Sequence, residues 1–511
     1  MDVATITAEG EEPVSTEPAP TEPVPLEPAA PPAPYDPTIR RLYSILFLLL
    51  FAFLIVRTLC VEPFGVTTGS MAETILGNRR CAACPRCGAE NCAGSPDDAK
   101  SNFNPQEYAA CWNCNFAPLN LASLAPGEIQ GDRLLVDKLV YSIRAPKRWE
   151  VAVFHCPVDD RKPYVKRVVG LPGETFRLWE GDAYANGEIL RKSMDQIRET
   201  RIPFFSHDEA PAEGWSSRWE IGPAAGREKL PATKAKLPDV AAVIQPKALV
   251  LDARNEAFGL TYVHRDLESE KPDFVRDRLG YNGGGRRREW LPVHDFCVSA
   301  EIEVGSGEGS LAMRLSDGAD SAIVELPIGF GTAGSMAREG GDPVPLHSKA
   351  TLKPGSTVRI EFAFVDRRIH LAIDNRELAV PIDVPKVPRK IGGTGPAGLR
   401  PGLMRPFQFG VRGASVVVRR LVLYRDIHYR TDDDDCSNAT RSDLKLAVDE
   451  YFVLGDNSAS SSDSRVWSTP GVPESFFLGK PFLIHQPLKQ GNLPFLGRVQ
   501  TIDWNRLRLL D

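Results

Sequence analysis

The stretch YVKRVVGLPGE, residues 164–174, is the most informative segment of this 511-residue chain. It begins as an apolar run suited to a β-strand and ends in Leu-Pro-Gly, which is typical of a turn. Because side chains alternate along a strand, Lys166, Val168 and Gly170 are expected on one face. Desolvation penalises the ammonium and lowers the pKa of a lysine held against apolar neighbours, so that its neutral amine can accept a proton. Protection of an edge strand from aggregation is the commoner role of such a lysine.

Two further segments carry polar residues in short loops. Residues 62–71 read EPFGVTTGSM and place Ser70 directly after a glycine. A serine in such a turn usually bonds only to the local backbone. Residues 455–465 read GDNSASSSDSR, and we expect Asp463 and Arg465 to pair and brace this loop. Neither segment alone indicates catalysis.

In their order and content, these three segments together resemble the bacterial type I signal peptidases. In that family a Gly-Ser-Met segment follows a transmembrane helix, a Lys-Arg-Val-Val-Gly-Leu-Pro-Gly-Asp segment comes next, and Gly-Asp-Asn precedes Ser-x-Asp-Ser-Arg. This chain departs at Glu73, Ser458 and Glu174, where the family usually has Pro, Arg and Asp. The similarity also includes GDRLLVDK (131–138), RWEVAVF (148–154) and ANG (185–187), and it covers approximately residues 62–78, 119–192 and 445–480.

The resemblance implies a role for each matching residue. Ser70 would attack the scissile carbonyl and Lys166 would be its general base, since a Ser-Lys pair is a known alternative to the Ser-His-Asp triad. The Ser70 backbone N–H and the Thr68 hydroxyl would form the oxyanion hole, and Ser461 would hydrogen-bond Lys166 and orient it. No cofactor is expected for catalysis. Supporting roles would fall to Met71, Asp456, Asp463 and Arg465.

A transmembrane helix is predicted over residues 40–61. Residues 42–56 (LYSILFLLLFAFLIV) are strongly apolar, and extension to Val61 gives the roughly 20 residues that cross a bilayer. Arg40 and Arg41 favour a cytoplasmic N-terminus under the positive-inside rule, which puts the catalytic domain on the outer face of the cytoplasmic membrane. A buried core helix is the alternative.

Six of the ten cysteines lie within residues 81–114. Two C-x-x-C pairs among them are typical of a zinc ribbon, in which four thiolates enclose a structural Zn²⁺. Cys81 lies three residues before Cys84, so the register of the first pair is open. Disulfides are the alternative, because an extracytoplasmic compartment is oxidising. The predicted zinc ligands are Cys84, Cys87, Cys111 and Cys114.

Residues 188–454 separate the second matching segment from the third, and they are far too many for a structureless loop. Short alternating strands with turn signals recur from about residue 248, which predicts a β-sandwich. A hairpin at residues 365–368 and a closing strand at 415–424 resemble concanavalin-like or laminin-G-like folds, which often bind sugars or proteins. The other strands of this region are expected at 296–304, 310–315, 357–364 and 368–374.

The predicted fold is mainly β. It has a signal-peptidase-like β catalytic core, one N-terminal transmembrane helix, a cysteine-rich zinc-ribbon-like insertion and an inserted β-sandwich. The predicted divisions are a disordered Pro/Glu-rich cytoplasmic tail (1–36), the transmembrane helix (40–61), the first part of the core (62–194) with the zinc-ribbon-like insertion (79–118), the insertion with the β-sandwich (195–435) and the second part of the core (436–511).

The resemblance implies a membrane-bound signal peptidase I, a serine endopeptidase that cleaves N-terminal signal peptides from exported preproteins by a Ser-Lys dyad. Its expected partners are preprotein signal peptides, the lipid bilayer and the export machinery. The net charge of −6 argues against nucleic acid. The alternative is a membrane-tethered glycan- or protein-binding module on an inactive peptidase scaffold, which the long insertion and the departures at Glu73 and Ser458 favour.

Overall fold

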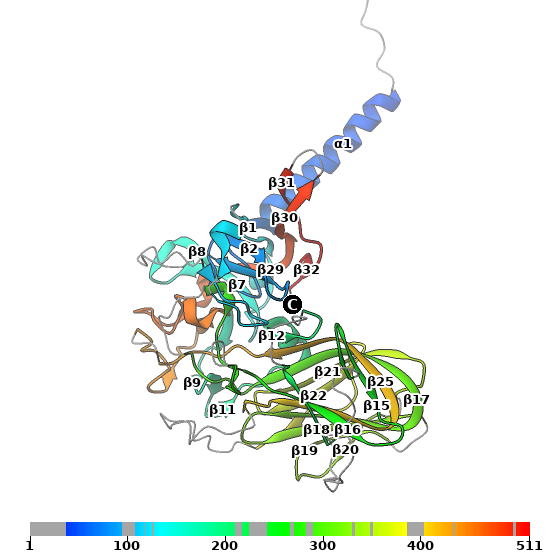
Figure 1. The fold of residues 1–511 in the computed structure, drawn as a ribbon. Helices are drawn as coiled ribbons and strands as arrows, with labels where there is room; N and C mark the ends of the chain where they lie inside the picture. The colour runs from blue at the N-terminus through cyan, green and yellow to red at the C-terminus, as the bar shows by residue number, and fades with distance from the viewer. Residues whose placement is uncertain are drawn as a thin grey trace, which may run out of the picture. The chain divides into compact units, whose positions relative to one another are not determined.

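The computed structural model confirms a mainly β protein with one long N-terminal helix (Figure 1). The predicted tail, residues 1–36, lies outside the described part of the chain. The structure describes residues 37–94, 108–117, 119–124, 127–209, 217–223, 243–265, 270–282, 290–329, 333–347, 351–385, 403–432, 435–493 and 497–510.

The N-terminal helix α1 (Pro37–Ile55) has 19 residues and is long and apolar enough to cross a membrane. A π-helical turn, η1 (Val56–Cys60), follows it. The predicted span included Val61, but this residue begins strand β1 (Val61–Gly65) and pairs with Asp137. Sheet pairing therefore begins at the predicted last residue of the helix. Within the described residues, the chain divides after Val56 into two compact units.

The three segments that resemble the peptidase family all start on one eight-stranded sheet or directly follow one of its strands. The first begins on β1, the second begins on β8, and the third follows β27. Its main order is β1-β6-β29-β7-β8-β27-β28, with β32 also paired to β29. The predicted strand around Lys166 is β8, and its partner β7 places Ala152 opposite Lys166. The remaining bounds are β6 Arg133–Asp137, β7 Val151–Cys156, β8 Asp159–Gly170, β27 Glu450–Leu454, β28 Val472–Pro473, β29 Phe477–Gln486 and β32 Arg508–Leu509.

A small four-stranded sheet continues from β8 in the order β11-β10-β9-β26. Helix α4 follows it and begins with a capping box, in which Ser193 and Gln196 bond to each other's backbone N–H groups. These elements connect the eight-stranded sheet to the long insertion. Their bounds are β9 Thr175–Trp179, β10 Asp182–Ala185, β11 Glu188–Ile189, α4 Met194–Thr200 and β26 Leu444–Lys445.

The insertion forms one 14-stranded sheet (Figure 1, green to orange). Its inner side chains build the largest of the hydrophobic cores among the described residues. The strands predicted at 296–304 and 310–315 are one strand, β17 (Phe296–Ser316), because bulges near Gly307 let the backbone continue without a turn. The other bounds are β12 Ile202–Ser206, β13 Trp219–Gly222, β14 Ile244–Gln245, β15 Ala248–Asp252, β16 Phe258–Tyr262, β18 Ser321–Ile328, β19 Ser335–Arg338, β20 Val344–Pro345, β21 Thr357–Val365, β22 Arg368–Ile373, β23 Arg376–Glu377, β24 Ile382–Asp383 and β25 Phe407–Arg425.

The hairpin predicted at residues 365–368 is present between β21 and β22. Its two turn residues, Asp366 and Arg367, have φ values of 49° and 58°. Two successive residues at positive φ are the mark of a type I′ turn, whose twist matches that of the flanking strands. The turn places the Asp366 carboxylate against the small sheet.

Buried charges join the insertion to the small sheet. Lys192, after β11, is 2% exposed. Its Nζ lies 3.0 Å from Asp366 and 2.7 Å from Asp426, which follows β25. Burial raises the pKa of Asp366 to about 7; Lys192 opposes this rise, and Asp426 and Asp182 add to it. One buried lysine thus lies between two buried carboxylates.

The cysteine-rich module consists of two short hairpins and one helical turn. The first hairpin pairs Cys81 with Cys92 across β2 and β3, and a disulfide joins them. The bounds in this module are β2 Arg79–Ala83, β3 Glu90–Gly94, β4 Tyr108–Ala109, β5 Leu119–Asn120 and α2 Leu121–Leu124. Elsewhere the described elements are α3 Val140–Ile143, η2 Gly280–Asn282, η4 Ser458–Ser460, η5 Glu474–Phe476, β30 Leu488–Leu493 and β31 Gly497–Ile502.

Candidate active site

Ser70 and Lys166 meet although 96 residues separate them. Ser70 lies in the turn after β1, and Lys166 lies on β8. The distance from Lys166 Nζ to Ser70 Oγ is 2.6 Å. Lys166 is 2% exposed and Ser70 is 5% exposed. The burial and this short contact place the amine where a general base for the Ser70 hydroxyl would have to lie.

Apolar side chains surround the turn that carries Ser70. Met71 is 1% exposed and belongs to a buried cluster with Leu134, Val136 and Val153 from strands β6 and β7. The predicted position of Met71 beside the nucleophile is therefore a packing position, in which it contributes to the exclusion of water.

Asp456 connects the turn of Ser70 to the strand of Lys166. Arg167 Nε and Nη2 donate to its two carboxylate oxygens at 2.8 Å and 2.7 Å. The Thr74 hydroxyl also donates to Asp456, at 2.5 Å. Successive side chains on a strand point to opposite faces, so Lys166 can reach Ser70 while Arg167 holds Asp456.

The loop after β27 holds the backbone on both sides of Ser70. The Asn457 N–H donates to the Ser70 carbonyl at 3.0 Å, and Asn457 Nδ2 donates to the Gly69 carbonyl at 2.9 Å. A Cβ on Gly455 would clash with the Ser461 hydroxyl and lie 2.5 Å from the Ser70 carbonyl oxygen. Only glycine permits this close approach.

Asp463 orients Ser461 within this loop. The Ser461 hydroxyl donates to Asp463 at 2.8 Å, and Arg465 contacts both oxygens of that carboxylate, at 2.9 Å and 2.8 Å. Burial alone would raise the pKa of Asp463, but Arg465, the Gly455 N–H and nearby Lys166 together hold it below its usual value. The predicted pair of Asp463 and Arg465 is thus present, and the predicted bond from Ser461 to Lys166 stays a prediction.

Ser458, where the family usually has arginine, receives two hydrogen bonds of its own. Its hydroxyl accepts from Arg465 Nη1 at 2.8 Å and from the Arg430 N–H at 2.8 Å. Arg430 follows the last strand of the insertion. The serine therefore ties the loop after β27 to the end of the insertion.

Thr68, two residues before Ser70, is half-buried. Within the described residues, the Ser70 backbone N–H donates no hydrogen bond to another backbone group. Both donors predicted for the oxyanion hole are thus available, although their role stays a prediction.

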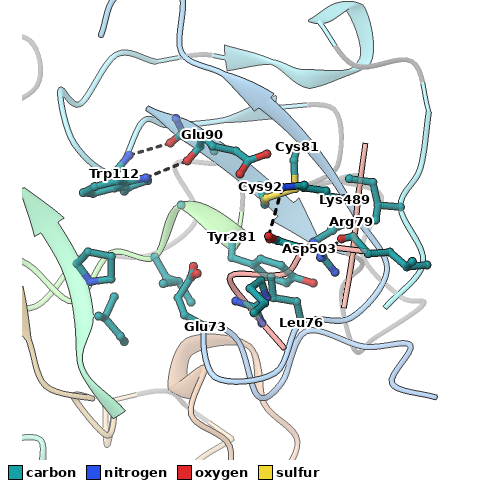
Figure 2. A pocket seen from close by; sticks show the side chains of 18 of the residues that line it. Glu73, Leu76, Arg79, Cys81, Glu90, Cys92, Trp112, Tyr281, Lys489 and Asp503 are labelled. Atoms are coloured by element: carbon teal, nitrogen blue, oxygen red, sulfur yellow. Dashed lines mark hydrogen bonds and ion pairs between the residues drawn. A yellow bond between two sulfur atoms is a disulfide. The ribbon is translucent and has the colours of Figure 1, made fainter. Parts of the chain in front are cut away.

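Glu73 lines a cavity of about 160 Å³ that does not include Ser70 or Lys166. Figure 2 shows Tyr281 and the Cys81–Cys92 disulfide at the wall of this cavity. Burial raises the pKa of Glu73, and nearby arginines, first Arg506, oppose the rise. The departure from proline at this position therefore adds a buried carboxyl to the turn that carries Ser70.

The four predicted zinc ligands gather in one place. The Sγ atoms of Cys84, Cys87, Cys111 and Cys114 all lie within 4.8 Å of one another. The Cys84–Cys114 and Cys87–Cys111 sulfur distances are 3.6 Å and 3.5 Å. Four thiolates at about 2.3 Å from a tetrahedral Zn²⁺ would stand about 3.7 Å apart. The backbone N–H groups of Arg86 and Cys114 point to sulfur at 3.4 Å, which suits thiolates, so the residues fit a closed metal site.

The sequence did not predict the roles of several residues of the site. Arg167 and Asn457 lie inside the segments that resemble the family, but only their contacts reveal what they hold. Thr74 lies one residue after Glu73 with no distinguishing pattern. Tyr281 and Asn282 come from the insertion, for which no local signal existed.

Comparisons with known proteins agree with the geometry. The model of the family described as signal peptidase, peptidase S26, matches residues 109–238 and 371–485. Lys166 and Ser461 lie within the matched residues, and Ser70 lies before them.

Several curated relatives of this chain are bacterial signal peptidases. A probable signal peptidase I-2 of Synechocystis sp. is 37% identical over 75 residues, which cover 14% of this chain and 34% of the relative. Signal peptidase I V of Bacillus subtilis is 30% identical over 114 residues, 22% of this chain and 61% of the relative. Signal peptidase I of Rickettsia massiliae is 28% identical over 173 residues, 34% and 52% of the two chains. The chain thus spans less than two thirds of the length of these relatives.

Solved structures match parts of this chain with low scores. Sheep galectin-11 in complex with glycerol covers 25% of this chain and 89% of its own, with 14% identity and a TM-score of 0.18. A carbohydrate-binding module from Bacillus subtilis covers 40% and 95%, with 12% identity and a TM-score of 0.22. Such scores carry no argument, and the concanavalin-like or laminin-G-like fold stays a prediction.

Proposed function

We propose that this chain, which is related to the bacterial type I signal peptidases, is a serine endopeptidase that cleaves signal peptides from exported preproteins. The observation that carries the proposal is the 2.6 Å approach of the Lys166 amine to the Ser70 hydroxyl in a buried site. Asp456, Asn457 and Asp463 support it, because they fix both partners from a third segment of the chain.

In the first half of the reaction, Ser70 Oγ attacks the scissile carbonyl carbon as Lys166 Nζ takes its proton. The carbonyl oxygen becomes an oxyanion and accepts hydrogen bonds from the Ser70 N–H and the Thr68 hydroxyl. One such donor contributes about 3–4 kcal/mol to transition-state stabilisation. Lys166 then gives its proton to the leaving amine, and an acyl-enzyme ester remains on Ser70.

In the second half, a water molecule attacks the ester carbonyl and Lys166 takes a proton from it. The same two donors stabilise the second oxyanion. Lys166 returns the proton to Ser70 Oγ, which leaves as the hydroxyl, and the enzyme is restored. By the family resemblance, small residues one and three positions before the cut define the substrate.

The proposed location is the cytoplasmic membrane, with α1 as the single anchor. The family is membrane-associated, and α1 has the required length and composition. Arg40 and Arg41 at its start support a cytoplasmic N-terminus and an outward-facing catalytic domain. There the enzyme would meet preproteins in the bilayer as the export machinery delivers them.

A structural Zn²⁺ held by Cys84, Cys87, Cys111 and Cys114 forms part of the proposal. The grouping of the four sulfurs and the N–H groups that point to them support it. The ion would hold the two C-x-x-C pairs, which we call the cysteine knuckles, together. It would take no part in catalysis, since four thiolates leave no open position.

Cleavage of a purified preprotein by the full-length protein in detergent tests the function. Ser70→Ala and Lys166→Ala are expected to abolish cleavage without a change in the thermal unfolding midpoint. Lys162→Ala is the matched control, because Lys162 lies on the same strand with its side chain 74% exposed, and it should cleave at the wild-type rate. Retained cleavage by Lys166→Ala would refute the dyad, and a wild-type protein that binds preprotein without cutting it would favour the binding-module alternative.

A further inference from the structure

The insertion reaches the catalytic loop through the short turn η2. Asn282 Nδ2 donates to Asn457 Oδ1 at 2.7 Å, and Asn457 Nδ2 donates to Asn282 Oδ1 at 2.6 Å. The two side-chain amides thus form a reciprocal pair across 175 residues. Asn457 is the residue that bonds to the backbone on both sides of Ser70.

This pair fixes the orientation of the Asn457 amide. Its NH₂ group has two hydrogens, and they go to the Gly69 carbonyl and to Asn282 Oδ1. If the amide turned over, its oxygen would face the Gly69 carbonyl and its NH₂ would face the NH₂ of Asn282. Both contacts would be repulsive, so Asn282 keeps the donor of Asn457 directed at the nucleophile turn.

Tyr281, the neighbour of Asn282, packs under the same turn. It is 2% exposed and belongs to a hydrophobic cluster with Ala72 and Leu76, which follow Ser70. A Cβ on Gly69 would clash with the Tyr281 ring. The ring therefore lies directly against the backbone of the residue before the nucleophile.

The other end of this short segment is bound to the cysteine-rich module. Arg278 Nη2 donates to the Cys111 carbonyl at 2.9 Å and to Asn115 Oδ1 at 3.0 Å. Four residues later the chain reaches Asn282. Residues 278–282, which we call the bridging segment, thus connect the second cysteine knuckle to the loop that holds Ser70.

We propose that the bridging segment positions the nucleophile and that Asn282 is a positioning residue acting through Asn457. This rests on the proposed function, in which Ser70 is the nucleophile. Asn282 touches neither Ser70 nor Lys166 in the contacts described, so its effect passes through the amide pair. The insertion is then a part of the catalytic apparatus as well as any binding role it has.

The test compares Asn282→Ala, Asn457→Ala and the double variant in preprotein cleavage by the full-length protein. Misplacement of a reacting group by about 1 Å can cost about 100-fold in rate. We expect Asn282→Ala to lower kcat roughly 10- to 100-fold with KM within about twofold of wild type. The double variant should be no slower than Asn457→Ala, because Asn282 acts only through that residue. Asn255→Ala, an exposed asparagine of the insertion, is the control and should match wild type.

Two readouts separate positioning from mere loss of folded protein. The pH midpoint of kcat/KM should shift in Asn282→Ala, since a displaced Ser70 changes the environment of Lys166, whereas a smaller amount of folded enzyme leaves the midpoint unchanged. The isosteric Asn282→Asp variant preserves the volume but sets a carboxylate against Asn457 Oδ1, and the same loss of kcat is expected. It serves where Asn282→Ala folds poorly.

Wild-type kcat in both Asn282 variants would overturn the proposal, and so would rate losses that multiply in the double variant. If the wild-type protein cleaves preprotein, either of these variant results would leave the proposed function intact. A wild-type protein that cleaves nothing would overturn both.

Discussion

The buried pair of Arg167 and Asp456 yields the sharpest prediction for stability. Asp456→Asn removes one negative charge and preserves the shape of the side chain. Arg167 and Asp456 have side chains 0% and 1% exposed, so the guanidinium would remain buried with its main partner neutral. Removal of one partner from a buried ion pair costs about 3–5 kcal/mol.

The lower end of that range is expected here. Glu199 lies 3.4 Å from Arg167 Nη1 and would offset part of the lost charge. The amide oxygen of asparagine could still accept from the Thr74 hydroxyl. We therefore expect Asp456→Asn to lower the free energy of unfolding by about 3 kcal/mol.

Urea unfolding of the full-length protein in detergent, followed by tryptophan fluorescence, measures this change. Glu339→Gln is the control, since its pair with Arg314 is exposed (48% and 30%) and should contribute only about 0–1 kcal/mol. A loss below about 1 kcal/mol in Asp456→Asn would show that the pair does not brace the site as the burial and geometry imply.

Three further changes have defined outcomes. Gly455→Ala should lower kcat by more than tenfold in the cleavage assay, because its Cβ would clash with the Ser461 hydroxyl; wild-type kcat would contradict the close approach. The pKa of Asp366 is about 7 in the folded protein and 3.8 in the unfolded chain. Between these pH values the unfolded chain has already lost the proton that the folded protein keeps, so the free energy of unfolding falls as pH rises from about 4 to 7. Asp366→Asn removes this component, and the difference in unfolding midpoint between variant and wild type should grow from about pH 4 to pH 7 and then level off; a constant difference would contradict it. Cys111→Ser should lose the one zinc ion per chain found by elemental analysis of the wild type and should lower the unfolding midpoint, whereas Cys81→Ser should retain the ion; zinc retained in Cys111→Ser would refute the ligand set.

The sequence predicted features that short patterns encode. The alternation around Lys166 predicted β8, and the turn residues at 365–368 predicted the hairpin. The spacing of the two C-x-x-C pairs predicted four sulfurs that gather, as they do. Each of these depends on residues within a few positions of one another, where propensity and spacing act directly.

Features that depend on distant partners were out of reach. Cys81 stood near a knuckle in sequence, but the register of β2 and β3 sets it opposite Cys92 instead. Asn282 gives no sign of its use, because its partner lies 175 residues away. The continuous strand β17 was also missed, since glycines that usually mark a turn here form bulges within a strand that has partners along its whole length.

The bonds around Ser70 also bear on when the enzyme becomes active. The Thr74–Asp456 and Asn457–Gly69 bonds span 382 and 388 residues. Contacts so far apart in sequence form late, because a long loop must close before they contribute. A chain still being synthesised therefore carries its serine and its lysine long before the loop that orders them has emerged. Under the proposed function, such a nascent chain would be inert until the segment that carries Asp456 and Asn457 has been made.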